Sequence, residues 1–287
     1  MNTQFPLLSE LAYWIKERQA IHERRAAGCP APWTTDPILA QYRFCNVRRE
    51  DDRVTRWVHD EWLRPNGERP LGDLVFATAV ARLVNWPPSL AEAKFPVPWR
   101  PEKFTALLNA RKARGEKVFT SAYMIRAIEA KDNETKADYL AKYVLAPLWA
   151  RRKKAPQDSL KALHAWLLPF YGMGSFIAAQ IVADVKWTPA LRSAPDWATF
   201  AAPGPGSVRG LNRVMGRDVN APWSPEEWHA ELLRLRKAII PKLPKGLRDL
   251  DAQNLQNCLC ETDKMLRAKN GEGRPRQNFK PSAERYI

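Results

Sequence analysis

The strongest constraint on the fold is the helical spacing of apolar residues along almost the whole chain. Apolar side chains recur at intervals of three and four residues, and no convincing run of the alternating strand pattern occurs. The 287 residues, 45% of them hydrophobic, are enough to bury a full core. We therefore predict an all-α catalytic domain over 1–270, built as two closely packed helical lobes. The predicted helices are 5–26, 41–63, 71–85, 101–114, 119–131, 135–153, 158–168, 173–186, 206–216, 224–239 and 249–269.

Proline-rich stretches interrupt these helices, because proline lacks an amide proton and restricts the residue before it. We predict rigid loops at WPPSLAEAKFPVPWRP (86–101), APGPG (202–206) and IPKLPKG (240–246), and a lobe boundary at the first of them. The polar, basic tail at 271–287 is expected to be extended. It either lies along a nucleic-acid backbone or forms a disordered end.

The charge of the chain favours a polyanionic partner. Forty-six Lys and Arg against 31 Asp and Glu leave a net charge of +15, spread along the sequence. Each phosphate that such a face neutralises releases counterions, so nucleic acid is the expected partner, although other basic proteins share this composition. No stretch of 18 uninterrupted apolar residues and no signal-like N-terminus occurs, so we expect a soluble intracellular protein without a membrane partner.

Four cysteines occur without the paired spacing of a zinc site or the run of an iron–sulfur site. We expect reduced thiols and no metal. The chain also has no G-x4-GK[ST] sequence, so any kinase step is expected to belong to another protein or region.

The stretch LPFYGMGSFIAAQ places two glycines between two predicted helices. Pro169 ends the first helix, and the glycines allow a positive φ before the second begins at Ser175. Unpaired amide protons at the start of that helix can hold a backbone phosphate without reading sequence. We expect a helix-hairpin-helix contact with DNA, and a turn that only packs small residues is the alternative. The residues assigned to DNA are Tyr171, Gly172, Met173, Gly174 and Ser175.

A carboxylate follows the turn at a suggestive distance. Asp196 lies 24 residues beyond Gly172 and ahead of GPGSVRGLNRVMG. This order resembles the helix-hairpin-helix DNA glycosylase superfamily, in which a catalytic aspartate follows a similar hairpin. The resemblance implies a glycosylase-like helical fold. The chain departs from that pattern in its Pro-Gly-Pro-Gly insertion and in Ser175, which stands near the hairpin where no lysine nucleophile is evident.

Four segments sharpen the match: YRFCNVRREDDRVTRWV (42–58), GMGSFIAAQIVADV, PGPGSVRGLNRV and QNLQNCLCETDKMLR (253–267). In this order they resemble the α-glutamyl/putrescinyl thymine pyrophosphorylase family, which includes the helical domain beside phage 5-hydroxymethyluracil DNA kinases. The resemblance implies thymine hypermodification in the cytoplasm of an infected bacterium. There a pyrophosphate ester on the 5-methylene carbon of a DNA uracil is displaced by an amine.

This chemistry implies DNA containing modified thymine as substrate and an amino acid or polyamine as co-substrate, with no bound cofactor. Other phage DNA-modification enzymes, such as a 5-hydroxymethyluracil DNA kinase, are the implied partners. The target base lies inside a duplex, so we expect it to be flipped out at a cost of roughly a few kcal/mol. Tyr171 and Met173 are the candidate wedges, with burial in the core as the alternative.

A departing pyrophosphate needs amide-rich loops and arginines. The segment PGPGSVRGLNR offers both, and a loop-to-helix junction with surface arginines is the alternative. The residues predicted to form the pyrophosphate cradle are Gly204, Gly206, Ser207, Arg209 and Arg213, with Ser207 capping the helix.

A charged stripe is expected on the helix predicted at 41–63, where Arg48, Asp52 and Arg56 are spaced i, i+4, i+8. Such a ladder on a solvated face is worth only about 0.3–0.5 kcal/mol per pair. Because these residues lie in a family segment, we favour a site in which Asn46 and Arg49 contact substrate and Asp52 orients an arginine.

An attacking amine must be neutral, so a carboxylate base is expected near the methylene carbon. Asp196 matches the glycosylase position, and Asp184 is the fallback, with a local cap or ion pair as its ordinary role. The segment 253–267 is predicted to pack against the 41–63 helix, with direct substrate contact as the alternative. A DNA glycosylase and a non-catalytic DNA-binding module remain the rival functions.

Overall fold

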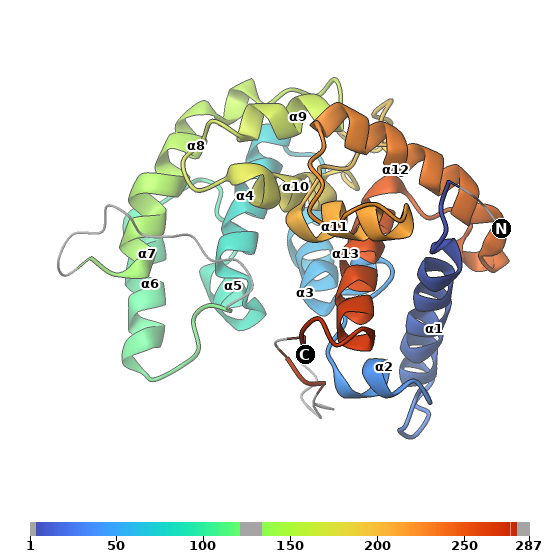
Figure 1. Cartoon of the computed structure of the whole chain (residues 1–287). Helices are drawn as coiled ribbons and strands as arrows, with labels where there is room; N and C mark the ends of the chain where they lie inside the picture. Colours follow the sequence, from blue (N-terminus) through green and yellow to red (C-terminus); the bar gives the residue numbers. More distant parts are fainter. Residues whose placement is uncertain (1–3, 121–133, 276, 280–287) are drawn as a thin grey trace. The chain divides into compact units, whose positions relative to one another are not determined.

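A computed structural model describes residues 4–120, 134–275 and 277–279, which form helices joined by turns and loops (Figure 1). Among these residues the only β-type pairing is one isolated antiparallel bridge between Tyr42 and Asn278. The all-α prediction is confirmed. The described chain divides into two compact units, one of 1–52 with 198–287 and one of 53–197. The boundary predicted at 86–101 is wrong, because that segment lies inside the second unit.

Aromatic packing explains why the proline-rich segment does not separate two lobes. Trp99 lies between two phenylalanine rings, with centroids 5.0 Å from Phe76 and 5.1 Å from Phe104. Phe95 packs on Trp62 at 5.9 Å. The segment is also not loop throughout, since prolines at its start are compatible with the first turn of a helix, α5 (Pro87–Ala93).

The first unit is built around α13 (Ala252–Lys269). Helices α1 (Leu8–Ala26), α2 (Pro37–Gln41), α11 (Pro205–Val214) and α12 (Pro225–Ile239) pack against it. Its core includes the fully buried indoles of Trp14 and Trp228. Fully burying a large apolar side chain contributes about 1.5–3 kcal/mol, so these rings contribute substantially to joining α1 and α12 to the unit.

The second unit is built around α4 (Leu71–Val84), which is apolar on nearly every side and almost wholly buried. It packs against α10 (Gly174–Val185), which forms a hairpin with α9 (Leu160–Leu167). The first of the remaining elements are α3 (Arg53–Trp57), a π-helical turn (Val58–Leu63), α5 and α6 (Pro101–Ala113). They are followed by α7 (Lys136–Tyr139), a second π turn (Leu140–Leu145), α8 (Ala146–Arg151) and a 3-10 turn (Arg152–Lys154).

Most predicted helices agree with the structure to within a few residues, and one agrees only in its second half. The single helix predicted at 41–63 is an extended segment, a 3-10 turn at Arg49–Asp51, α3 and a π turn. The stripe of Arg48, Asp52 and Arg56 therefore does not lie on one helix. The helix predicted at 119–131 falls mostly on 121–133, outside the described residues. In the described part of the chain, no helix combines the length and apolarity needed to cross a membrane.

Candidate functional site

The extended segment 43–49, here called the strap, lies along α13 and is held by side chains of that helix. Its backbone donates from Cys45 N to Glu261 Oε2 and from Arg49 N to Asn254 Oδ1, both at 2.9 Å. Its carbonyl oxygens accept from Asn257 Nδ2 (Asn46 O, 3.1 Å), Lys264 Nζ (Arg43 O, 3.0 Å) and, weakly, Cys258 Sγ (Val47 O, 3.8 Å).

These contacts explain why the strap is not helical. Its amide and carbonyl groups bond to side chains one turn apart on α13, so they do not need helical partners. The prediction that 253–267 packs against the 41–63 segment is confirmed, although the partner is extended. The polar side chains of α13 that hold the strap are fixed by these hydrogen bonds. Direct substrate contact by them stays a prediction.

Asn46 lies at the junction of the strap with α1. Its Oδ1 accepts from the buried guanidinium of Arg18, and its Nδ2 donates to Asp51 O at 2.9 Å. Asp51 Oδ2 in turn lies 3.6 Å from His22 Nε2. Burial lowers the pKa of Arg18 to about 10. Asn46 therefore joins two elements of the unit, and its role in substrate contact stays a prediction.

Arg49 and Asp52 begin and close the 3-10 turn, since Asp52 N donates to Arg49 O at 2.9 Å. Asp52 is exposed and is the last residue of the N-terminal part of the first unit. Arg48 does not pair along a helix with Asp52 as the stripe implied, but bonds to Asp249 Oδ1 at 2.5 Å and to Gly246 O at 2.9 Å. The substrate roles of Arg49 and Asp52 stay predictions.

Glycines of α11 allow it to pack very closely on α13 (Figure 1). A Cβ at Gly210 would lie 2.2 Å from Leu259 O, and one at Gly206 would lie 2.3 Å from Cys260 Sγ. Helix packing thus accounts for Gly206, and its part in the pyrophosphate cradle stays a prediction. The residue capping α11 also differs from the prediction, because the helix begins at Pro205 with Gly204 as N-cap.

Ser207 is the third residue of α11 and is fully buried. Its Oγ accepts from Gly204 N and donates to Gly204 O, both at 3.0 Å. The hydroxyl therefore closes the first turn from inside the helix and is not its N-cap. A part for Gly204 or Ser207 in binding an anion stays a prediction.

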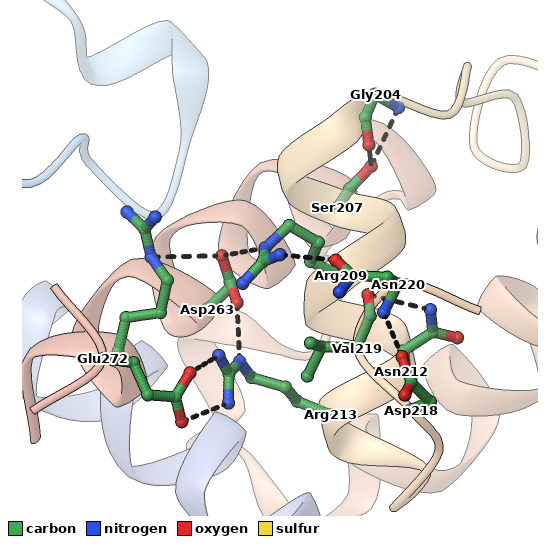
Figure 2. A network of polar contacts seen from close by, with 11 residues as sticks. Gly204, Ser207, Arg209, Asn212, Arg213, Asp218, Val219, Asn220, Asp263 and Glu272 are labelled. Carbon is green, nitrogen blue, oxygen red and sulfur yellow. Dashed lines mark hydrogen bonds and ion pairs between the residues drawn. The ribbon is translucent and has the colours of Figure 1, made fainter. Parts of the chain in front are cut away.

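Three arginines surround one buried carboxylate where α11 meets α13, a group here called the arginine cluster (Figure 2). Asp263 Oδ1 accepts from Arg213 Nε at 2.6 Å, and its Oδ2 accepts from Arg209 Nε at 3.3 Å. Arg267 Nε lies 3.6 Å from the same Oδ2. Arg209 Nη1 also donates to Asn220 Oδ1 at 2.9 Å. The cluster brings together one predicted pair, Arg209 and Arg213, with two residues that were not assigned to the site.

A second carboxylate closes the cluster from the loop after α13. Arg213 is only 7% exposed, and its Nη1 and Nη2 donate to the two oxygens of Glu272, the first at 3.1 Å. Figure 2 shows this two-pronged pairing. Hydrogen bonds from Arg213, and then from Asn270, lower the pKa of Glu272 to about 2, and the same contact raises the pKa of Arg213.

In the second unit, the glycine turn has the predicted backbone. Gly172 and Gly174 have φ of +76° and +49°, and α10 begins at Gly174, within one residue of the predicted start. Tyr171 is 38% exposed at the turn, whereas Met173 is fully buried. The wedge assigned to Met173 is therefore core, as the alternative held. Phe176, on the first turn of α10, is 54% exposed and was not among the predicted wedges.

Asp196 caps α9. Its Oδ1 accepts from Leu160 N and its Oδ2 from Lys161 N, both at 2.8 Å. Ser175, exposed at the turn, contacts the same helix through its carbonyl, 3.1 Å from His164 Nε2. Each oxygen of a carboxylate that accepts one such bond can accept another. The base role of Asp196 stays a prediction.

Asp184 is fully buried and paired with Arg82. The guanidinium donates from Nη2 to Oδ1 at 2.7 Å and from Nε to Oδ2 at 2.5 Å, and Thr55 Oγ1 accepts from Nη2 at 2.9 Å. His59 Nε2 lies 3.8 Å from Asp184 Oδ1. The ion-pair alternative for Asp184 is confirmed. A single Arg in the apolar run LVFATAVARLV was the available signal of a buried partner.

Comparison with known proteins identifies the family. The family described as "5-hmdU DNA kinase, helical domain" matches residues 6–274. The chain belongs to this family. It is 27% identical over 279 residues to the "5-hmdU DNA kinase" of Bacillus phage SP10. The aligned region covers 87% of this chain and 43% of that protein. The chain thus spans less than half the length of this relative. No solved structure matches it.

Proposed function

We propose that this protein is a DNA-modifying transferase that replaces pyrophosphate on a 5-pyrophosphoryloxymethyl-uracil in DNA with an amine. In this reaction the bond from the 5-methylene carbon to the pyrophosphate oxygen breaks with its electron pair leaving on that oxygen. The amine nitrogen forms the new bond to carbon and loses one proton to a base. An amino acid such as glycine, or a polyamine, supplies the nitrogen.

The arginine cluster is the observation that carries this proposal. Three guanidinium groups face one fixed aspartate, and this excess of donors is the arrangement that stabilises charge developing on a leaving phosphate. Membership in a family named for a 5-hmdU DNA kinase supports modified DNA as the substrate. The net charge of +15 supports binding to its backbone.

In the first unit, three of the family segments meet at α13. The strap is held by side chains of the 253–267 segment, which is part of α13. The PGPGSVRGLNRV segment packs on the same helix. Tyr171 at the glycine turn and Asp196 behind it are proposed to contact DNA and to accept the amine proton, respectively. A chain without a G-x4-GK[ST] sequence fits a step that follows phosphorylation.

The direct test is mass spectrometry of nucleosides after incubation of the protein with pyrophosphorylated DNA and a panel of amines. A transferase yields an intact, heavier nucleotide and free pyrophosphate. An abasic site would assign the protein to the DNA glycosylases. Binding without any product, unaffected by Asp196→Asn, would assign it to non-catalytic DNA-binding modules.

The base is tested by Asp196→Asn, with Asp158→Asn as the matched control in an exposed part of the same unit. We expect Asp196→Asn to lower turnover by roughly 10²–10⁴-fold while DNA affinity is retained. The control should leave both unchanged. Equal turnover in the two variants would limit Asp196 to capping α9.

A further inference from the structure

Arg213 presents a two-pronged donor that is already occupied by a carboxylate of the same chain. Its Nη1 and Nη2 bond to the two oxygens of Glu272, and its Nε bonds to Asp263. A carboxylate and a phosphate offer the same pair of acceptor oxygens to a guanidinium. Glu272 therefore occupies the position that a phosphate would take on Arg213.

The two carboxylates of the arginine cluster are held in different ways. Asp263 lies on α13, is almost fully buried and accepts from both α11 arginines. Glu272 follows the end of that helix, and its side chain is 40% exposed. Gly271 and Gly273 flank it, both with positive φ and with nothing near the position of a Cβ. Asp263 is a fixed part of the site, whereas the Glu272 side chain can swing into solvent.

The charges of the cluster change when Glu272 leaves. With Glu272 in place, three guanidinium groups face two carboxylates. Without it, the same three face only Asp263, and the outer donors of Arg213 lose their partner. Leaving the charged donors of a buried guanidinium without an acceptor is unfavourable, so another anion must take the place of the Glu272 carboxylate. Two phosphate groups joined in a diphosphate suit the neighbouring Arg209 and Arg267, which are partly exposed.

We propose that Glu272 is an internal competitor for this site, and that a diphosphate displaces its side chain from Arg213 and binds across Arg213, Arg209 and Arg267. The identity of the ligand rests on the proposed transferase function, in which pyrophosphate is the leaving group. The exchange weakens the affinity for free pyrophosphate, because part of the binding energy is spent in breaking the Glu272 contact. The product is therefore released more readily after turnover.

The experiment measures binding of inorganic pyrophosphate to the whole chain by calorimetry, without DNA or amine. Glu272→Gln is compared with wild type and with Glu10→Gln. Glu10 is a suitable control because it also pairs with a cation of α13, Lys269, at 3.1 Å, and its removal changes the net charge equally. We expect Glu272→Gln to bind pyrophosphate roughly tenfold more tightly. If Glu272 occupies Arg213 about nine-tenths of the time, only about one-tenth of the wild-type protein is free to bind.

Further arms identify the ligand and the residues that hold it. Orthophosphate and unmodified duplex DNA should gain less affinity than pyrophosphate from Glu272→Gln, whereas an equal gain for DNA would make the site one for backbone phosphate and overturn the proposal. Arg267→Ala should weaken pyrophosphate binding in either background. Glu272→Ala is a second variant that should reproduce the gain.

Unchanged or weaker pyrophosphate binding in both Glu272 variants would overturn the inference and leave Glu272 as an anchor for the loop. The same would follow if Glu10→Gln gained as much affinity as Glu272→Gln. Because these measurements do not require turnover, the result is separable from that of the proposed function. If no transferase product formed but Glu272→Gln still bound pyrophosphate more tightly, the cluster would be a diphosphate site that serves another activity.

Discussion

Each unit of the protein holds an aspartate paired with arginine, and the two pairs differ in balance and exposure. In the second unit Asp184 and Arg82 neutralise each other, are both almost wholly buried, and bond through two prongs. In the first unit Asp263 faces three arginines, two of them about one-third exposed. A balanced, closed pair has no donors to offer a ligand. An open cluster with excess donors does, so the same residue types serve structure in one unit and are available for binding in the other.

The largest expected effect is on the closed pair. Asp184→Asn leaves the Arg82 guanidinium buried without its counter-charge, which costs about 3–5 kcal/mol of unfolding free energy. Urea denaturation of wild type and variant measures the loss. The double variant Arg82→Met/Asp184→Leu is the control, because it removes both charges and should recover most of the stability. A loss below about 1 kcal/mol for Asp184→Asn would remove the contrast with the first unit.

The next effect concerns the helix packing on which the open cluster depends. Gly210→Ala places a Cβ against Leu259 O and should destabilise the first unit by about 1–3 kcal/mol or more, because backbone must shift. Gly246→Ala, in the same unit, meets nothing within 4 Å and serves as the control. Thermal unfolding distinguishes the two. We also expect pyrophosphate affinity to fall in Gly210→Ala, since Arg209 and Arg213 move with α11.

A smaller effect on stability is expected at the rim of the open cluster. Arg267→Ala removes a partly exposed guanidinium 3.6 Å from Asp263, and such contacts are worth less than about 1 kcal/mol. Chemical denaturation should therefore give a curve close to that of wild type, while pyrophosphate binding is weakened. A loss as large as that of Asp184→Asn would show that the arginine cluster of the first unit is structural, as the Arg82–Asp184 pair of the second unit is. Arg234→Ala, at an exposed pair on α12, is the control.

The smallest effect lies on the other face of α13. Cys45 is exposed, but the Glu261 carboxylate, followed by desolvation, raises the pKa of its thiol to about 12. About one thiol in ten thousand is then ionised at pH 8, so alkylation should be slow and should speed up as pH rises. Glu261→Gln should lower that pKa and accelerate the reaction at pH 8. Mass spectrometry of iodoacetamide adducts measures it, with the exposed Cys29 as internal reference. Equal rates at Cys45 in both proteins would contradict this cause.

The local helical pattern was sufficient to predict the all-α class, most helix positions and the positive φ of both turn glycines. It failed in the first half of the predicted 41–63 helix, because the partners that hold the strap extended are Asn254, Asn257 and Glu261, more than 200 residues away. Local periodicity carries no information about such partners.

The site was predictable only in part for the same reason. Arg209 and Arg213 lie one turn apart in the sequence and were found, whereas Glu272 joins them only after α13 folds against α11. Likewise, the sequence placed Asp184 near the end of an apolar helix, but its pairing with Arg82 depends on the packing of α10 on α4. The spacing of Arg209 and Arg213 within one helix could be anticipated, whereas these two pairings between helices could not.

The attachment of the strap has a consequence for how this protein can diverge. Side chains of α13 form hydrogen bonds with main-chain groups of residues 43, 45, 46, 47 and 49. Every amino acid except proline provides both a backbone N–H and a C=O group. The outward side chains of Arg43 and Cys45 are therefore not needed to hold the segment in place. Mutation can change these side chains while the backbone of the strap keeps its position. The strap is thus suited to acquire new chemical selectivity without a new fold.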